Sequence, residues 1–87
     1  MKHAGLEAIS RLEDVLAELR VIDALKEKRP GVFYRRSKAF LHFHEDPAGL
    51  FVDVRLSGED FTRMAVNSAA ERKRFVKAVQ TTLGASS

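Results

Sequence analysis

Apolar and polar residues alternate most regularly over residues 39–56, and this alternation predicts two paired strands. Residues 46–49 (Asp-Pro-Ala-Gly) separate the two runs and have the residue preferences of a type I turn. With this turn as the loop, His42 stands opposite Asp53. A register one residue off would mix the apolar and polar positions, so burial of the apolar positions fixes the pairing.

The two faces of this predicted hairpin differ in character. One face is apolar and carries Leu41, Phe43, Val52, Val54 and Leu56. The other face, called the histidine face below, carries Phe40, His42, His44, Phe51, Asp53 and Arg55. We expect helices to cover the apolar face, which leaves the histidine face open to solvent, a ligand or a partner.

A helical period precedes the hairpin. Apolar residues recur every three or four positions from Leu6 to Ile22, which predicts one amphipathic helix over residues 5–28 that a Pro-Gly pair ends. Such a helix would be about 36 Å long, which is longer than a domain of this size is wide. We therefore expect it either to break near residues 20–21 or to extend beyond the domain and pack on a second subunit.

The last part of the chain predicts a second helix. Ser68 and Glu71 match a capping box, in which each residue's side chain binds a backbone N–H of the other. Apolar residues then recur with helical spacing up to Leu83, and Gly84 ends the pattern. We expect residues 85–87 to form a frayed tail.

Residues 32–35 are rich in β-prone side chains and predict a further strand before the hairpin. A tight turn at Arg36-Ser37 would connect the two. In that arrangement the alternation puts Val32 and Tyr34 on the apolar face, and it puts Phe33 and Arg35 on the histidine face.

Residues 61–66 predict either a short fourth strand or an irregular return to the second helix. The order is then helix, an antiparallel meander of three or four strands, and helix. This order is typical of an α+β fold with two layers and the helices on one face of the sheet. We expect residues 1–87 to form a single domain.

The composition is that of an ordinary folded domain, with 45% hydrophobic and 31% charged residues. The chain has no cysteine, which excludes disulfides and zinc-thiolate sites. No apolar run approaches the roughly 20 residues of a membrane span, and charged residues from Glu7 onward interrupt any signal-peptide core. We therefore expect a cytoplasmic protein without membrane contact, and we expect no cofactor.

The net charge of +3 is divided into blocks of opposite sign. Residues 26–38 carry six Lys or Arg against one acid, whereas residues 39–62 carry one against five. The basic block is the best candidate for binding nucleic acid, because cations contact phosphate and its aromatic residues can stack on bases. The residues that would do so are Lys28, Arg29, Arg35, Arg36 and Lys38. A solvated charged surface explains the same block, and no nucleic-acid-binding motif is present, so we expect nucleic acid to be an unlikely partner.

Metal binding is one chemistry that the histidine face offers. His42 and His44 are two residues apart on one strand, so their imidazoles project the same way about 7 Å apart. Two such imidazoles can share a metal ion given a third ligand, and Asp53 is placed to supply it or to orient a ring. His3 and Asp46 are further candidates by residue type alone.

The same pair has a plainer explanation, since His42 and Asp53 can form an ordinary cross-strand polar pair. A catalytic role would need a nucleophile as well, and the serines and threonines nearby are not in settings that activate one. The glycines are scattered and form no phosphate-binding loop. The sequence therefore leaves enzymatic activity undecided and favours its absence.

Aromatic residues accompany the histidines on this face, namely Phe33, Phe40 and Phe51. Exposed aromatic side chains beside polar groups indicate a surface that something covers. A small ligand, a protein partner or a second copy of the sheet would do so. Self-association is the simplest of these explanations, and we expect a homodimer. The residues we expect to contact a ligand are His42, His44, Asp53, Arg55, Phe40 and Phe51.

Residues 40–46 (Phe-Leu-His-Phe-His-Glu-Asp), followed by Asp53 on the next strand, resemble the pattern of a bacterial "luciferase-domain" family of small proteins. That family is described by H-x-H-x-D on one strand and an Asp on the next. The resemblance places this motif on His42, His44, Asp46 and Asp53. It implies a compact bacterial α+β module and no particular reaction.

Residues 33–43 are also similar, more loosely, to YjbR-like domains, which are small α+β proteins sometimes proposed to bind DNA. From all these features we expect a non-enzymatic interaction or ligand-binding module that associates with itself. The alternatives are a metal site on His42, His44 and Asp53, and nucleic-acid binding through residues 26–38.

Overall fold

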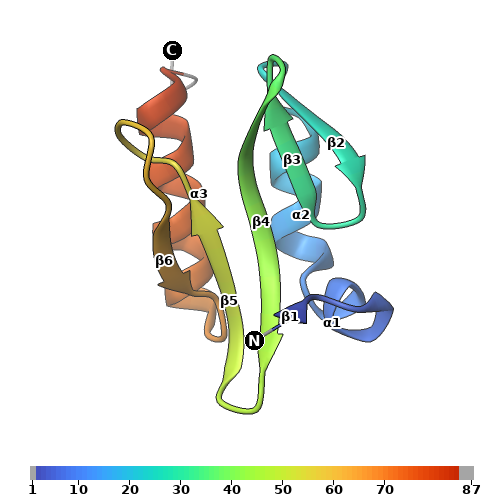
Figure 1. Ribbon diagram of the computed structural model, residues 1–87. Helices are drawn as coiled ribbons and strands as arrows, with labels where there is room; N and C mark the ends of the chain where they lie inside the picture. Colours follow the sequence, from blue (N-terminus) through green and yellow to red (C-terminus); the bar gives the residue numbers. More distant parts are fainter. Residues whose placement is uncertain (1, 85–87) are drawn as a thin grey trace.

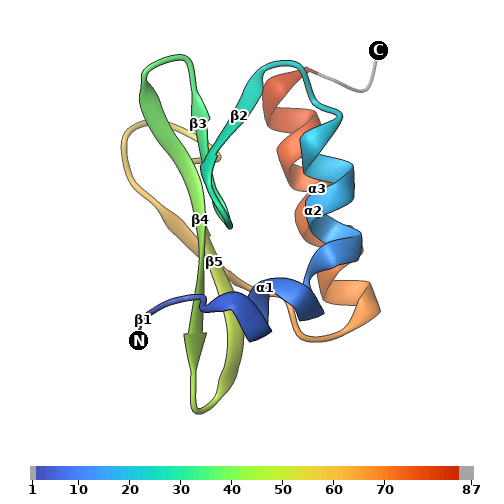
Figure 2. The same ribbon diagram turned by 90° about the vertical axis from the view of Figure 1, so that its right-hand side faces the viewer.

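The computed structural model describes residues 2–84, so the predicted tail over residues 85–87 lies outside the described residues. Within that range the chain forms a six-stranded antiparallel sheet with three helices on one face (Figures 1 and 2). The strands are β1 (Lys2–His3), β2 (Leu25–Arg29), β3 (Val32–Arg35), β4 (Lys38–Asp46), β5 (Gly49–Val54) and β6 (Thr62–Ala65). The helices are α1 (Leu6–Arg11), α2 (Glu13–Arg20) and α3 (Ala69–Leu83). This confirms the two-layer α+β fold, and it adds β1 and β2 to the strands that the sequence predicted.

The sheet is a meander in the order β2-β3-β4-β5-β6, with β1 paired to β4. β4 is the longest strand, and two strands share one of its edges. β3 pairs with β4 from Lys38 to His42, whereas β1 pairs with it at His44 and Glu45. The start of the chain therefore lies end to end with β3 beside the central strand.

The β4–β5 hairpin has the register that the alternation predicts. His42 pairs with Asp53 and Phe43 pairs with Val52, and the two-residue loop lies between Asp46 and Gly49. The Asp46 carboxylate accepts a hydrogen bond of 2.9 Å from the backbone N–H two residues on, which is the Asx turn that favours Asp at this position.

The predicted helix over residues 5–28 is wrong over its last third, residues 21–28, and is interrupted once before that. The helical backbone is broken at Leu12, where φ is −104° and ψ is 13°, and α2 ends at Arg20 as expected for a break near residues 20–21. Residues 25–29 form β2 because their backbone groups pair with β3. Because α2 ends at Arg20, the length of the helix no longer argues for a second subunit.

An ion pair fixes this helix-to-strand change. Arg20, the last residue of α2, donates to the carboxylate of Glu27 on β2 at 2.7 and 3.2 Å, and the same carboxylate accepts from the Gly31 N–H at 3.2 Å. The hydrogen bond from Arg20 lowers the pKa of Glu27. The ion pair between Arg20 and Glu27 thus holds β2 against the C-terminal end of α2.

The core lies between the sheet and the helices. Most of its fully buried side chains come from the helices and from the apolar face of the hairpin, among them Leu12, Leu16, Leu19, Leu41, Phe43, Val52, Val54, Phe75 and Val79. Leu6 was expected in this core but is 82% exposed. The break at Leu12 changes the direction of the six-residue α1, so its first residue points to solvent.

Strand β3 presents the opposite faces from those predicted for Val32 and Phe33. Phe33 pairs with Leu41 and is buried in the core, whereas Val32 pairs with His42 on the histidine face. The reason is a bulge in β4, where Phe40 has no partner in β3, so that the pairing shifts by one residue between Phe33 and Tyr34. On the turn side of the bulge, Tyr34 pairs with Ala39 and Arg35 pairs with Lys38, which is the register that a tight turn at Arg36-Ser37 predicts.

Helix α3 begins at the capping box, as the sequence predicts. Ser68 Oγ accepts from the Glu71 N–H at 3.1 Å, and the Glu71 carboxylate accepts from the Ser68 N–H at 3.0 Å. α3 ends at Gly84, whose φ of 68° is the left-handed conformation that glycine adopts without strain. Across residues 2–84, no helix is long and apolar enough to cross a membrane.

Candidate metal centre

The strand pairing gathers all three histidines of the chain on one side of the sheet. His42 and His44 project from β4, and β1 pairs with β4 so that His3 lies beside His44. The ring centroid of His3 lies 5.4 Å from that of His42 and 5.3 Å from that of His44. The centroids of His42 and His44 are 4.5 Å apart. Residues about 40 positions apart in the chain are therefore neighbours here.

Asp53 joins this cluster from β5. It pairs with His42 across the ladder, but its Oδ2 lies 3.0 Å from Nε2 of His44, the diagonal neighbour. One ligand atom from each of His42, His44 and Asp53 lies within 4.8 Å of the others. A nitrogen, a nitrogen and a carboxylate oxygen thus converge on one small volume.

Burial makes this convergence unusual. His44 is 8% exposed and Asp53 is 7% exposed, and they are the buried polar residues of the described chain. Nδ1 of His42 and both ring nitrogens of His44 are buried without a hydrogen-bond partner among the described residues. His44 Nε2 has the carboxylate of Asp53 as a charged neighbour at 3.0 Å, but it makes no hydrogen bond to it. Buried polar atoms are rarely left unpaired, because each one costs about 1–3 kcal/mol.

Arg63 on β6 is a further member of the site that the sequence did not predict. It pairs with Asp53 across the β5–β6 ladder, and its guanidinium donates to both carboxylate oxygens at 2.8 and 2.9 Å. The hydrogen bonds from Arg63 lower the pKa of Asp53, so the carboxylate is ionised. Finding this arginine from sequence would have required the register of residues 61–66, which the pattern left open.

His42 is the half-buried member of the cluster. Burial is the main reason that the pKa of His42 is lowered, and the neighbouring His44 lowers it further. The ring of His42 is therefore neutral near neutral pH. Neutral imidazole is the form that binds metal ions. The ring of Phe61, from the β5–β6 loop, packs edge-on against His42 at 4.9 Å and covers it from the solvent side.

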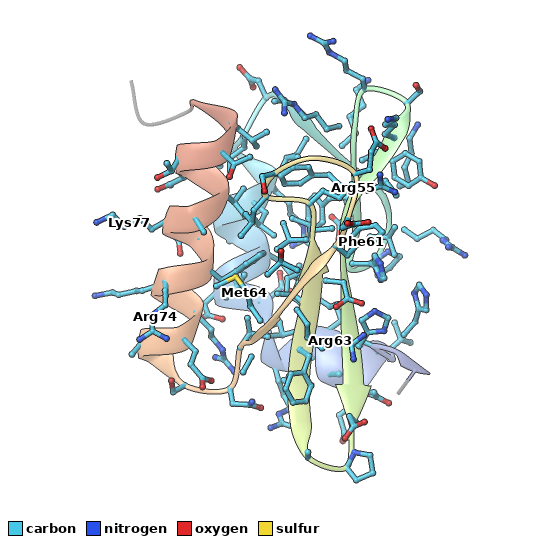
Figure 3. The ribbon with its side chains drawn as sticks, turned by 60° about the vertical axis from the view of Figure 1, so that its left-hand side comes forward. Arg55, Phe61, Arg63, Met64, Arg74 and Lys77 are labelled. Atoms are coloured by element: carbon cyan, nitrogen blue, oxygen red, sulfur yellow. The ribbon has the colours of Figure 1, made fainter. Side chains whose placement is uncertain are left out.

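Figure 2 shows that the β5–β6 loop lies on the side of the sheet away from α2 and α3. In Figure 3, Arg55, Phe61 and Arg63 lie on this same side, whereas Arg74 and Lys77 point away from α3 into solvent. The histidine face is therefore partly covered by the protein's own loop.

This cover corrects the prediction of exposed aromatic residues. Phe33 and Phe40 were expected on the histidine face, but both belong to the buried core, with exposed fractions of 1% and 4%. Phe51 is half-buried opposite His44. The aromatic argument for a second copy of the sheet on this face therefore fails for Phe33 and Phe40.

The remaining candidates lie further from the cluster. Asp46, which the family resemblance includes, is at the hairpin turn, where its carboxylate accepts from Ala48. Arg55 follows β5 and lies over the Phe61 ring, 4.4 Å from its centroid.

The basic candidates for nucleic-acid binding divide into two groups. Arg35, Arg36 and Lys38 line one cavity with Arg55. Lys28 and Arg29 lie on β2, where Lys28 sits over the Tyr34 ring at 5.9 Å and Arg29 lines a separate hollow beside His3. The structure therefore gives two small basic areas where the sequence predicted one cluster.

Comparisons of the chain with protein-family models, with curated proteins and with solved structures found no match.

Proposed function

We propose that this protein binds a divalent transition-metal ion through His42, His44 and Asp53. The observation that carries the proposal is the convergence of their ligand atoms, all within 4.8 Å of one another, at a place where buried imidazole nitrogens lack partners. Around a tetrahedral zinc ion, ligand atoms 2.0–2.2 Å from the metal are about 3.4 Å apart. Shifts of about 1 Å in these side chains therefore suffice to form the site.

The ligand set favours particular metals. Imidazole nitrogen with carboxylate oxygen suits Zn²⁺, and it also suits Co²⁺, Ni²⁺ and Cu²⁺. Ca²⁺ and Mg²⁺ prefer sites made only of oxygen ligands. Zn²⁺ is the first choice because its coordination number of four matches three protein ligands and one more.

His3 is the residue that supplies the fourth ligand. Its ring lies 5.3–5.4 Å from the other two imidazoles, and it is exposed, so its side chain is free of packing that would resist rotation. Binding through His3 would link β1 to β4 through the metal in addition to their backbone pairing.

Arg63 competes with a metal ion for the carboxylate of Asp53. Both oxygens of Asp53 already accept from Arg63, so a metal ion must displace at least one of these bonds or leave Asp53 to orient His44. Arg63 is attached to an edge strand and half of its side chain is exposed, so its guanidinium can turn to solvent.

The test is titration of metal-stripped protein with Zn²⁺ by isothermal calorimetry, with elemental analysis of the bound metal. We expect one ion per chain. His44→Ala should weaken binding by at least about a hundredfold, and His3→Ala by about tenfold, which correspond to about 2.7 and 1.4 kcal/mol.

The control is Asp14→Asn, because this carboxylate is exposed and pairs only loosely with Arg72 at 3.6 Å. It should leave Zn²⁺ binding unchanged, whereas Asp53→Asn should weaken it. Circular dichroism of each variant separates loss of the site from loss of the fold. Equal metal content in the wild type and in a folded His42→Ala/His44→Ala double variant would overturn the proposal.

A further inference from the structure

The cavity lined by Arg35, Arg36 and Lys38 has a volume of about 510 Å³ and opens near the tip of the β3–β4 hairpin. Its lining comes from the hairpin turn, the start of β4 and the residues that follow β5, and includes none of the histidines. Four of its lining residues are cations: Arg35, Arg36, Lys38 and Arg55. No acidic residue is part of the lining.

Arg36 is held in this cavity at a conformational cost. Its φ of 59° makes it the only non-glycine residue in the described chain with positive φ. It is the first residue of a two-residue hairpin loop between Arg35 and Lys38, a position at which glycine is favoured when φ is positive. Strained residues persist where they serve a purpose, and here the strain presents a guanidinium to the cavity.

Arg55 supplies a donor without a partner. Its Nε is buried and has no hydrogen-bond partner among the described residues. The guanidinium is held in place because its Cζ lies 4.4 Å from the centroid of the Phe61 ring. Because the side chain is 25% exposed and its Nη1 lies 3.4 Å from Glu59 Oε1, its terminal nitrogens are suited to a planar or tetrahedral anion.

Glu59 shows where an anion fits. Its carboxylate accepts from Lys38 Nζ at 3.1 Å through both oxygens and lies 3.4 Å from Arg55 Nη1. The Glu59 side chain is 77% exposed and comes from a loop, so it is easily displaced. The protein's own carboxylate thus bridges two of the four cations.

We propose that this cavity binds the phosphate group of a small phosphorylated molecule, which displaces the Glu59 carboxylate. A phosphate carries more charge than a carboxylate and has three terminal oxygens, so it can contact Arg36, Lys38 and Arg55 together. The volume is within the range of about 300–1,000 Å³ that small-molecule sites have.

The separation of the basic residues favours a small ligand over a nucleic acid. A nucleic-acid strand needs a track of cations along its backbone. Lys28 and Arg29, which could extend such a track, do not line this cavity.

The test measures binding of inorganic phosphate, AMP and a mixed ten-nucleotide DNA by NMR titration, with ionic strength held constant by NaCl. We expect phosphate and AMP to shift the backbone amides of residues 35–38 and 55–59. Arg36→Gly should weaken AMP binding about tenfold, and Glu59→Gln should strengthen it several-fold, since a competing carboxylate is removed. Arg36→Gly also tolerates the positive φ, so its fold is not at risk.

Arg74→Ala is the matched control, because Arg74 is an exposed arginine on α3 that points away from the sheet (Figure 3). It should leave AMP binding unchanged. Two results would overturn the proposal: AMP binding that is the same in Arg36→Gly and the wild type, or DNA binding that is tighter than AMP binding and spreads its shifts to β2.

Discussion

Nε2 of His44 lies 3.0 Å from Oδ2 of Asp53, although the residue opposite Asp53 in the β4–β5 ladder is His42. The carboxylate therefore leans diagonally along the sheet and lies within reach of both imidazoles. On its other side it accepts two hydrogen bonds from Arg63. A single buried acid thus joins the histidines of β4 to the arginine of β6.

This arrangement predicts that Arg63 opposes metal binding. In Arg63→Gln, Asp53 is released from its two hydrogen bonds to the guanidinium, and a positive charge next to the site is removed. We expect Zn²⁺ affinity to rise about tenfold, which corresponds to roughly 1.4 kcal/mol. Calorimetric titration at pH 7 measures it. A fall in affinity would mean that Arg63 orients Asp53 for the metal instead of competing with it.

The conformation of Arg36 predicts a stabilising substitution. Glycine adopts a φ of 59° without the clash of a Cβ atom, so Arg36→Gly should raise the free energy of unfolding by about 1 kcal/mol. Urea denaturation in phosphate-free buffer measures the change. Arg35→Gly is the control and should destabilise the protein, because Arg35 lies in strand β3. Destabilisation by Arg36→Gly would show that the arginine makes contacts worth more than its strain.

Two glycines with positive φ should respond differently to alanine. At Gly49 a Cβ atom would lie 2.6 Å from Oδ1 of Asn67, whose side chain binds the backbone of Leu50 at 2.8 and 3.3 Å. At Gly58 nothing lies within 4 Å. Gly58→Ala should therefore cost only about 1 kcal/mol for the backbone conformation, whereas Gly49→Ala should cost about 2–4 kcal/mol because it also disrupts Asn67.

Thermal and urea unfolding of these two variants gives the comparison. Equal losses would mean that Asn67 moves aside without cost and that only the backbone conformation matters at Gly49.

The ion pair between Arg20 and Glu27 predicts a dependence of stability on pH. Because the pKa of Glu27 is lower in the folded state than its unfolded value of 4.5, ionised Glu27 stabilises the fold above that pH. This contribution is lost as the pH falls through the lowered folded value. Glu27→Gln should thus lower the free energy of unfolding at pH 7 by about 1 kcal/mol.

As the pH falls below 4.5 and through the lowered folded pKa of Glu27, the wild type and Glu27→Gln should converge, since the wild-type carboxyl also becomes neutral. Urea denaturation of both proteins at several pH values measures this. A constant difference at every pH would show that the charge of Glu27 does not contribute. Glu18→Gln, which changes an exposed acid on α2, is the control and should leave the free energy of unfolding at pH 7 within about 0.5 kcal/mol of the wild type.

Local patterns in the sequence were enough to determine the hairpin and the second helix. The Asp-Pro-Ala-Gly turn and the strict alternation around it leave one register that buries Leu41 and Val54 together, and that register is observed. The capping box at Ser68 and the glycine at 84 also act within a few residues, and both ends of α3 are as predicted. The pairing of His42 with Asp53 follows from the same short-range geometry.

The elements that were predicted wrongly depend on distant partners. Residues 25–29 have no alternating pattern, and they are a strand because β3 offers them backbone groups to pair with. The bulge at Phe40 of β4 puts Phe33 on the face opposite to the one predicted, and nothing in the local sequence signals it.

The candidate site is divided in the same way. The sequence by itself determined that His42, His44 and Asp53 share a face, because they belong to one hairpin whose register is fixed locally. Only the tertiary structure brought His3 and Arg63 to them, because β1 and β6 join the sheet through pairings with β4 and β5 that no local pattern encodes. Only the packing around the sheet decided which ring nitrogens of His42 and His44 would be buried and left without a hydrogen-bond partner.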